Sequence, residues 1–268
     1  MLEKVIKPMR KVLLFFTILI NISCSNTDKD ISSIIPISNG SLELVQTFGG
    51  SKNDVAKSVI ATSDGGFAVL GYTQSMDGDV TGKNNENYDF WVLKFNSEAQ
   101  LEWNKTYGGS GDDRGRSIIE TSDGGYALIG YSDSSDGDVT INYGNRDFWV
   151  IKINATGAIT WEKSFGYSGV DEGVSILETS DNHFILSGVL DVTASGGDGN
   201  TGRYSPRHAG GDYWSIKINA SGGTVWSRFY GGSFTDAPTG VIENINGDLI
   251  TVGGSDSNDV DISNNKGT

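Results

Sequence analysis

Cysteine and histidine are almost absent from this 268-residue chain, which limits the chemistry it can perform. Cys24 is the only cysteine, so no disulfide can form within the chain, and His183 and His208 are the only histidines. We recognise no Ser-His-Asp arrangement, no zinc-ligand cluster and no phosphate-binding glycine loop. The sequence therefore predicts a protein that is not an enzyme.

Positive charge and proline are also scarce. Twenty Lys and Arg residues stand against 34 Asp and Glu, giving a net charge of −14. This balance excludes nucleic acid as a partner, because binding phosphates needs a basic surface. Only four prolines accompany 37 glycines and 10% aromatic residues. Glycine supplies the positive φ angles of tight turns and aromatic residues favour strands, so we expect an all-β protein.

The N-terminus has the pattern of an export signal. Basic residues precede an apolar run over residues 12–22 that is too short to span a bilayer. Cys24 follows directly and resembles the lipidated cysteine of bacterial lipoproteins. This predicts a lipoprotein signal peptide over residues 1–24 and a polar tether over residues 25–40. An ordinary cleaved secretion signal is the alternative, and either Met1 or Met9 can be the start.

All six tryptophans belong to one internal repeat. Trp91, Trp149 and Trp214 each follow an Asp-aromatic pair, and each is followed by a second tryptophan at the same spacing. Around them, short apolar runs alternate with Asp-Gly turns, which predicts antiparallel four-stranded units. Such units bury their apolar faces by stacking on one another. We therefore expect the tryptophans to pack between units rather than to stack on sugars. Lys94, Lys152 and Lys217 are expected to face solvent or pair with acids.

The repeat motifs resemble a known family. Aromatic-Gly-Gly-Ser followed by an Asp, then Thr-Ser-Asp-Gly-Gly-aromatic, then Asp-Phe-Trp-Val-x-Lys are similar to the SBBP-type β-propeller repeats of bacterial surface proteins. The resemblance covers residues 41–268 and implies an incomplete β-propeller with three full blades and part of a fourth. The expected elements are a closing strand over 41–48 and blades over about 55–107, 114–165, 173–230 and 238–268.

The end of the sequence carries a further expectation. Residues 238–268 provide two strands and a long loop, and an Asp-aromatic-Trp strand is due where the sequence stops. This predicts that the chain is a fragment of a longer propeller. A natural ring with a defective fourth blade is the alternative.

Acidic residues recur in two kinds of loop. The loops entering each unit carry a carboxylate in register, at Asp54, Asp113, Asp171 and Asp236. We expect these four to bond backbone groups where blades meet. The long loops between second and third strands carry Asp77, Asp79, Asp136 and Asp138. Carboxylates two residues apart are candidate Ca²⁺ ligands, although Asp beside Gly is also common in plain turns.

Only the third long loop departs from the repeat. It contains Arg203, Tyr204, Arg207 and His208, in an otherwise acidic protein. Arg and Tyr are frequent contact residues, and binding residues often lie on loops of a rigid scaffold. This loop is therefore a candidate ligand-binding site. A tolerated surface insertion is the alternative.

These observations predict a lipid-anchored β-propeller at the bacterial outer membrane or cell surface. It is expected to bind or scaffold a protein, a glycan or an envelope component. One alternative is a carbohydrate-acting hydrolase or lyase, since the separation of two catalytic carboxylates is a spatial quantity that sequence does not give. Another is a spacer for a missing C-terminal domain.

Overall fold

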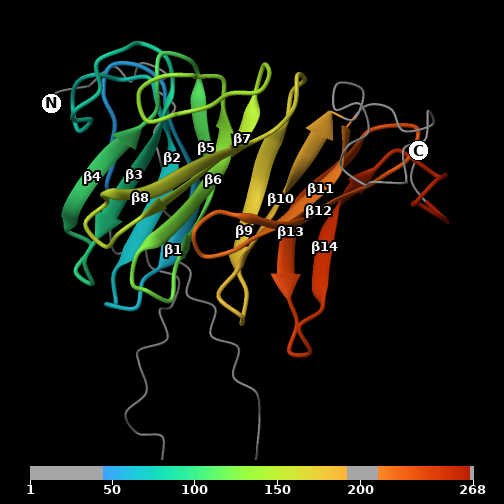
Figure 1. Ribbon diagram of the computed structural model, residues 1–268. Helices are drawn as coiled ribbons and strands as arrows, with labels where there is room; N and C mark the ends of the chain where they lie inside the picture. The colour runs from blue at the N-terminus through green and yellow to red at the C-terminus, as the bar shows by residue number, and fades with distance from the viewer. Residues whose placement is uncertain (1–44, 192–210, 266–268) are drawn as a thin grey trace, which may run out of the picture.

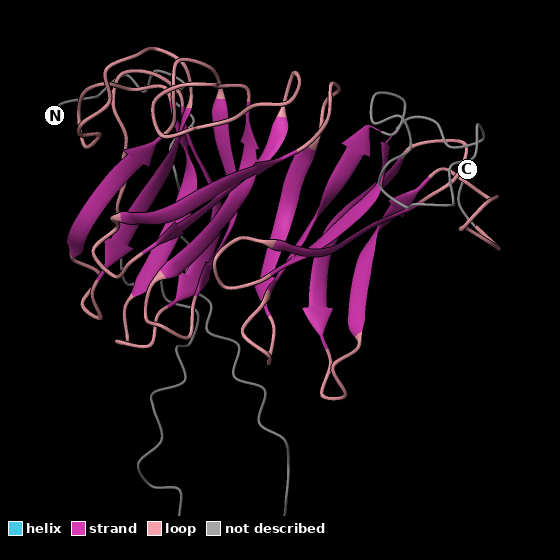
Figure 2. Cartoon of the chain, in the orientation of Figure 1, coloured by secondary structure: helices cyan, strands magenta, loops and turns pink. Residues whose placement is uncertain are grey.

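The computed structural model describes residues 45–191 and 211–265, and this part of the chain is entirely β-structure (Figures 1 and 2). It contains 14 strands in four antiparallel sheets and no helix. Accordingly, no helix in these residues is long and apolar enough to cross a membrane. The prediction of an all-β chain built from four-stranded antiparallel units is confirmed, with a fourth sheet of two strands.

Strands are hydrogen-bonded in chain order within every sheet. Sheet 1 contains β1 (Asp54–Ala61), β2 (Phe67–Thr73), β3 (Asp89–Phe95) and β4 (Leu101–Tyr107). Sheet 2 contains β5 (Asp113–Glu120), β6 (Tyr126–Ser132), β7 (Asp147–Ile153) and β8 (Ile159–Phe165). Sheet 3 contains β9 (Glu172–Glu178), β10 (Phe184–Asp191), β11 (Gly211–Ile218) and β12 (Thr224–Tyr230). Sheet 4 contains β13 (Asp236–Glu243) and β14 (Leu249–Ser255).

The turn between the first and second strands shows why the Thr-Ser-Asp-Gly-Gly motif recurs. In sheet 1, Asp64 Oδ1 accepts hydrogen bonds from the Thr62 hydroxyl at 2.5 Å and from Gly66 N at 2.9 Å. Gly65 has a φ of +84°, which glycine adopts without strain. In sheet 3, Asn182 takes the glycine position with a φ of +59°, which asparagine tolerates better than most residues.

The sheets pack against one another in the order of the chain. β5 contacts β1, β2 and β3 of the preceding sheet, β9 contacts β5, β6 and β7, and β13 contacts β9, β10 and β11. The first strand of each sheet therefore lies against the sheet before it (Figure 1). All first strands begin at or next to the entry Asp, one or two residues before the predicted blade starts.

Apolar side chains fill the spaces between successive sheets. The first tryptophan of a sheet packs on an aromatic residue of the preceding sheet: Trp149 lies 4.8 Å from Phe90, and Trp214 lies 4.8 Å from Phe148, measured between ring centroids. Trp91, Trp149 and Trp214 are all buried. The tryptophan repeat of the sequence is thus a repeat of packing contacts between sheets.

One detail differs from the sequence expectations. Residues 45–48 of the expected closing strand form no strand, and residues 41–44 lie outside the described part. A strand needs a neighbour for its backbone N–H and C=O groups, and no described strand lies beside residues 45–48. For Lys94 and Lys152, the expectation of pairing with acids is confirmed, and both residues are buried. Their ammonium groups pair with acids in the first hairpin turn, 2.7 Å from Asp64 and 2.9 Å from Asp123.

Candidate ligand-binding site

The entry aspartates join two loops at each junction between sheets. Asp113 Oδ2 accepts hydrogen bonds from Gly109 N at 2.7 Å and from the Ser134 hydroxyl at 2.8 Å. Asp54 and Asp236 make the equivalent bonds, to Gly50 and Ser75 and to Gly232 and Ser257 respectively. All four entry aspartates are buried. They therefore fix the connection between sheets to the long loop of the following sheet.

Asp171 makes a different set of bonds because the motif around it has changed. Tyr167 stands where the other connections have a second glycine, and its backbone N donates to Asp171 Oδ2 at 2.7 Å. Asp171 Oδ1 accepts from Asp191 N at 2.7 Å. Both of these hydrogen bonds to Asp171 come from backbone amides.

The candidate calcium ligands also bond the backbone. Asp136 Oδ1 accepts from Ser110 N at 2.6 Å, and Asp138 Oδ2 accepts from Gly108 N at 3.1 Å. Asp77 and Asp79 make the same bonds to Ser51 N and Gly49 N. In the described ranges, no group of three or more His, Cys, Asp or Glu side chains is placed to hold a metal. The calcium site stays a prediction. The four carboxylates stabilise the loops by accepting hydrogen bonds from backbone N–H groups.

At the junction between sheets 1 and 2, a second carboxylate approaches the entry aspartate across a glycine. A Cβ atom on Gly108 would lie 2.6 Å from Asp113 Oδ2 and 2.8 Å from Asp89 Oδ1, so only glycine fits between the two. Lys83 Nζ lies 2.9 Å from Asp89 Oδ1, and its side chain is 0% exposed. Burial raises the pKa of Asp113 to about 7 and also raises the pKa of Asp89, against the opposing effect of Lys83.

The next junction contains the same pair without a lysine. A Cβ atom on Gly166 would lie 2.0 Å from Asp147 Oδ1, and Asp171 is near enough for its charge to act on Asp147. Burial raises the pKa of both carboxyl groups to about 6, and the charge of Asp171 raises that of Asp147 further. Within the described residues, no Lys or Arg pairs with either group, and Asp147 Oδ1 is buried without a hydrogen-bond partner.

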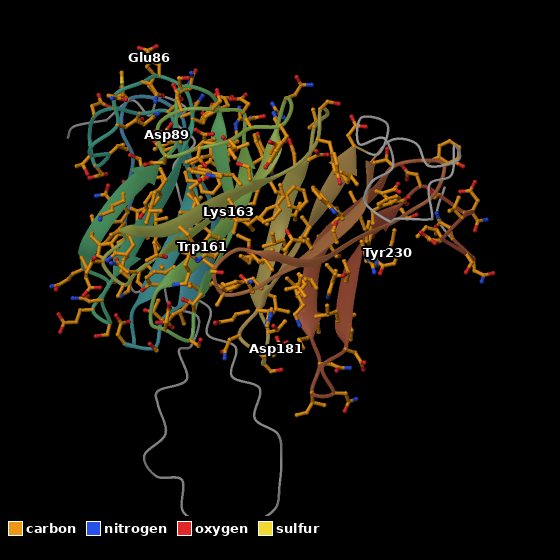
Figure 3. All side chains as sticks on the ribbon, viewed as in Figure 1. Glu86, Asp89, Trp161, Lys163, Asp181 and Tyr230 are labelled. Carbon is orange, nitrogen blue, oxygen red and sulfur yellow. The ribbon has the colours of Figure 1, made fainter. Side chains whose placement is uncertain are left out.

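A polar cavity of about 350 Å³ opens between sheets 1 and 2 at the end that carries the long loops. Three aspartates and one lysine contribute its charges: Asp89, Asp136, Asp138 and Lys83. The remaining lining residues are Gly82, Asn84, Asn85, Thr106, Gly108, Gly109, Ser110 and Gly137. Figure 3 shows Asp89 among the loops at this end, far from Asp181 at the opposite end.

The walls of this cavity are held in place by hydrogen bonds between loops. Lys83 Nζ donates to Asn85 Oδ1 at 2.8 Å, and Asn85 Nδ2 donates to Gly109 O at 2.9 Å. Asn87 Nδ2 donates to Ser110 O. The long loop of sheet 1 is thereby attached to the entry loop of sheet 2. The cavity therefore has fixed walls before any ligand arrives.

Two residues of this cavity, Asp136 and Asp138, were predicted from the sequence as candidate Ca²⁺ ligands. Its other charged residues, Asp89 and Lys83, were not predicted to belong to a binding site. No repeated motif contains Lys83, Asn84 or Asn85. The feature of the sequence that could have indicated the site was a lysine within an acidic loop. Of the other predicted site residues, Asp77 and Asp79 lie in the equivalent loop of sheet 1, away from the cavity lining. Arg203, Tyr204, Arg207, His208 and Cys24 lie outside the described residues.

The chain matches no model of a known protein family and no curated protein. The function proposed below therefore rests on the geometry of the described residues and on the motifs of the sequence. The cavity between sheets 1 and 2 is the feature of that geometry with the clearest binding capacity.

Proposed function

We propose that the chain is a surface-displayed β-propeller module that binds a glycan at the end carrying its long loops. Radial arrangement of the sheets is supported by the way each first strand lies against the preceding sheet. The packing of Phe48 also supports a radial arrangement. The ring of Phe48 lies 5.1 Å from the ring of Phe95, measured between centroids, and Phe95 occupies the position in sheet 1 that Ile153 occupies in sheet 2. Ile153 belongs to the same packed cluster as Tyr107, which precedes sheet 2 as Phe48 precedes sheet 1.

The observation that carries the binding role is the cavity of about 350 Å³ between sheets 1 and 2. Its volume lies within the range of about 300–1,000 Å³ that is usual for small-ligand sites. Asp136, Asp138, Asn84 and Thr106 offer oxygen and amide groups suited to hydrogen-bonding sugar hydroxyls. The net negative charge of the lining and of the chain disfavours anionic ligands. A neutral or amine-bearing saccharide fits this chemistry.

Attachment to the cell surface rests on the sequence. The apolar run and Cys24 support a lipid anchor, and the repeat motifs support kinship with SBBP-type surface propellers. Labelled palmitate is expected to enter the wild-type protein in a bacterial host and not the Cys24→Ala variant. Equal labelling of both proteins, or of neither, would contradict the anchor.

The binding role is tested by a glycan array followed by calorimetry on the best saccharide. Thr106→Val removes a hydroxyl from the cavity at nearly constant volume, and Asn84→Ala removes an exposed amide that bonds no other residue in the described part of the chain. Each is expected to weaken binding roughly fivefold to tenfold, the effect of losing about one hydrogen bond. Thr224→Val on β12, outside the cavity, is the matched control. No saccharide bound, or equal losses for Thr106→Val and Thr224→Val, would refute the proposal.

Hydrolysis of the bound saccharide is the second candidate function. Burial raises the pKa of Asp138, and Asp136 lines the same cavity. Two carboxyl groups in one cavity, one of them with a raised pKa, are the groups that glycoside cleavage uses. Release of reducing ends by the wild type, abolished in Asp138→Asn, would establish this activity. Binding of a saccharide without release of reducing ends would contradict hydrolysis and support binding as the function.

A further inference from the structure

The cavity between sheets 1 and 2 contains more negative charge than its own residues neutralise. Its lining has three aspartates and one lysine. Lys83 Nζ lies 2.9 Å from Asp89 Oδ1, and the Lys83 side chain is 0% exposed, so its charge is used within the wall. No other Lys, Arg or His is among the described residues that line the cavity. Asp136 and Asp138 are therefore left without a cation in the lining.

Each of these two carboxylates binds the backbone through one oxygen only. Ser110 N donates to Asp136 Oδ1 at 2.6 Å, and Gly108 N donates to Asp138 Oδ2 at 3.1 Å. Asp136 is exposed and Asp138 is partly exposed, so a molecule in the cavity can reach the second oxygen of each. Asp136 Oδ2 and Asp138 Oδ1 are thus acceptors that the wall offers to a ligand.

A third carboxylate lies against the same part of the wall. Asp89 lines the cavity and is only 6% exposed, and its buried Oδ1 has no partner in the described residues apart from the ion pair with Lys83. A Cβ atom on Gly108 would lie 2.8 Å from Asp89 Oδ1, and Gly108 N binds Asp138, so the two carboxylates meet at this glycine. Burial raises the pKa of Asp89 and the charge of Asp138 raises it further, against the opposing effect of Lys83. A second cation at this place would lower the electrostatic cost of the buried carboxylates.

An ammonium group matches the acceptors that the cavity offers. It has three N–H donors, and its hydrogen bonds to carboxylates are strengthened by charge. Ca²⁺ instead takes about six to eight oxygen ligands, and Asp136 and Asp138 have one remaining oxygen each. The volume of about 350 Å³ also accommodates a larger body than a single ion. Both observations favour an organic molecule that carries an amine.

We infer that the cavity selects saccharides that carry a free amino group, and that their ammonium group lies between Asp136 and Asp138. Thr106 and Asn84 then bind neighbouring hydroxyl groups of the sugar. This selection rests on the proposed glycan binding and defines its ligand class, an amino sugar whose nitrogen is not acetylated. Acetylation removes the positive charge and two of the three N–H donors, and it leaves the carboxylates desolvated without a cation.

The first test compares two ligands that differ only in acetylation. Calorimetry of the full chain is done with the tetramers of glucosamine and of N-acetylglucosamine, in the same linkage, at about pH 6.5, where an amine of this kind is mostly protonated. The glucosamine tetramer is expected to bind at least roughly tenfold more tightly, the effect of a hydrogen bond to a charged group. Equal affinities would overturn the selection and leave glycan binding intact. Binding of neither tetramer would also overturn the selection, and the glycan array then decides whether glycan binding fails with it.

The second test separates the cavity from the net charge of the chain, because a protein with a charge of −14 attracts any cation. Asp138→Asn and Asp79→Asn remove the same charge from equivalent loops. Asp79 Oδ2 accepts from Gly49 N at 2.9 Å, as Asp138 Oδ2 accepts from Gly108 N, but Asp79 does not line the cavity. Asparagine keeps an oxygen that can accept this bond. Asp138→Asn is expected to weaken binding of the glucosamine tetramer roughly tenfold, and Asp79→Asn by less than about twofold.

A second matched pair repeats this comparison and keeps it decisive if Asp138→Asn does not fold. Asp136→Asn changes a carboxylate of the cavity, and Asp77→Asn changes its equivalent in sheet 1, which binds Ser51 N at 2.8 Å. Asp136→Asn is expected to weaken binding of the glucosamine tetramer more than Asp77→Asn does. Equal losses within both pairs would show that the amine responds to the charge of the whole chain, and they would overturn the assignment of the ammonium group to Asp136 and Asp138.

Discussion

The two junctions between the four-stranded sheets handle the same buried acid pair in different ways. Between sheets 1 and 2, Asp89 and Asp113 approach each other across Gly108, and the buried ammonium group of Lys83 lies 2.9 Å from Asp89. Between sheets 2 and 3, Asp147 lies against Gly166 and the charge of Asp171 acts on it, and no described cation pairs with either acid. One repeat thus yields a junction in which a lysine pairs with one of the two acids and a junction in which neither acid has a described cation.

This difference shows what the repeat does and does not conserve. The carboxylates are kept because each accepts backbone N–H groups that would otherwise be buried without a partner, at Gly109 for Asp113 and at Tyr167 for Asp171. The repeat does not supply a positively charged partner for these carboxylates at each junction: Lys83 pairs with Asp89, and no described residue plays this part for Asp147. Desolvation is the largest cause of the raised pKa values at both junctions: the pKa of Asp147 and of Asp171 rises to about 6, and the pKa of Asp113 rises to about 7.

Removing Lys83 is expected to have the largest effect. Lys83→Met leaves Asp89 buried without its cation, which should lower the free energy of unfolding by about 3–5 kcal/mol at neutral pH. Urea unfolding measures it. Lys163→Met, at an exposed lysine on β8, should change little. Adding Asp89→Asn to Lys83→Met should recover most of the loss, and failure to recover would mean that the lysine acts through packing instead of charge.

The second junction should respond to pH. Because the folded-state pKa of Asp147 and Asp171 is raised to about 6 from 3.8, neither group costs stability below about pH 4. Stability should fall as pH rises from about 4 through about 6, and Asp113 extends the fall to about pH 7. Asp123 acts in the opposite sense, because Lys152 and nearby hydrogen bonds lower its pKa to about 2, and its contribution is lost only at lower pH.

Asp147→Asn isolates this effect. The amide oxygen can still accept from Tyr143 N, as Asp147 Oδ2 does, and no charge is buried. At about pH 8 the variant should be more stable than the wild type by about 2 kcal/mol, and at about pH 4 the gain should vanish. Thermal melts at both values provide the measurement. A gain of equal size at both values would show that ionisation of Asp147 is not its source.

The sequence predicted the strands and turns of the sheets better than the contacts between residues at the junctions. The Asp-aromatic-Trp motif and the Asp-Gly turns locate the strands, because turn geometry and strand alternation are local properties. The entry aspartates were expected to bond backbone at junctions, and Asp113 does so at Gly109. Lys83 escaped prediction because its partner Asp89 comes close only through the path of a long loop without a motif. The cavity beside it was missed for the same reason.

The smallest effect is expected from the charges just outside the second acid pair. Glu172 accepts from Arg146 at 2.9 Å and from Arg116 at 3.4 Å, in a partly exposed network next to Asp171. Such pairs contribute about 0.2–1 kcal/mol, and salt screens them. Glu172→Gln should therefore lower stability by less than about 1 kcal/mol at low salt and by almost nothing at about 1 M salt. A larger loss that persists in high salt would mean that this network, and not protonation alone, compensates the buried acids of the second junction.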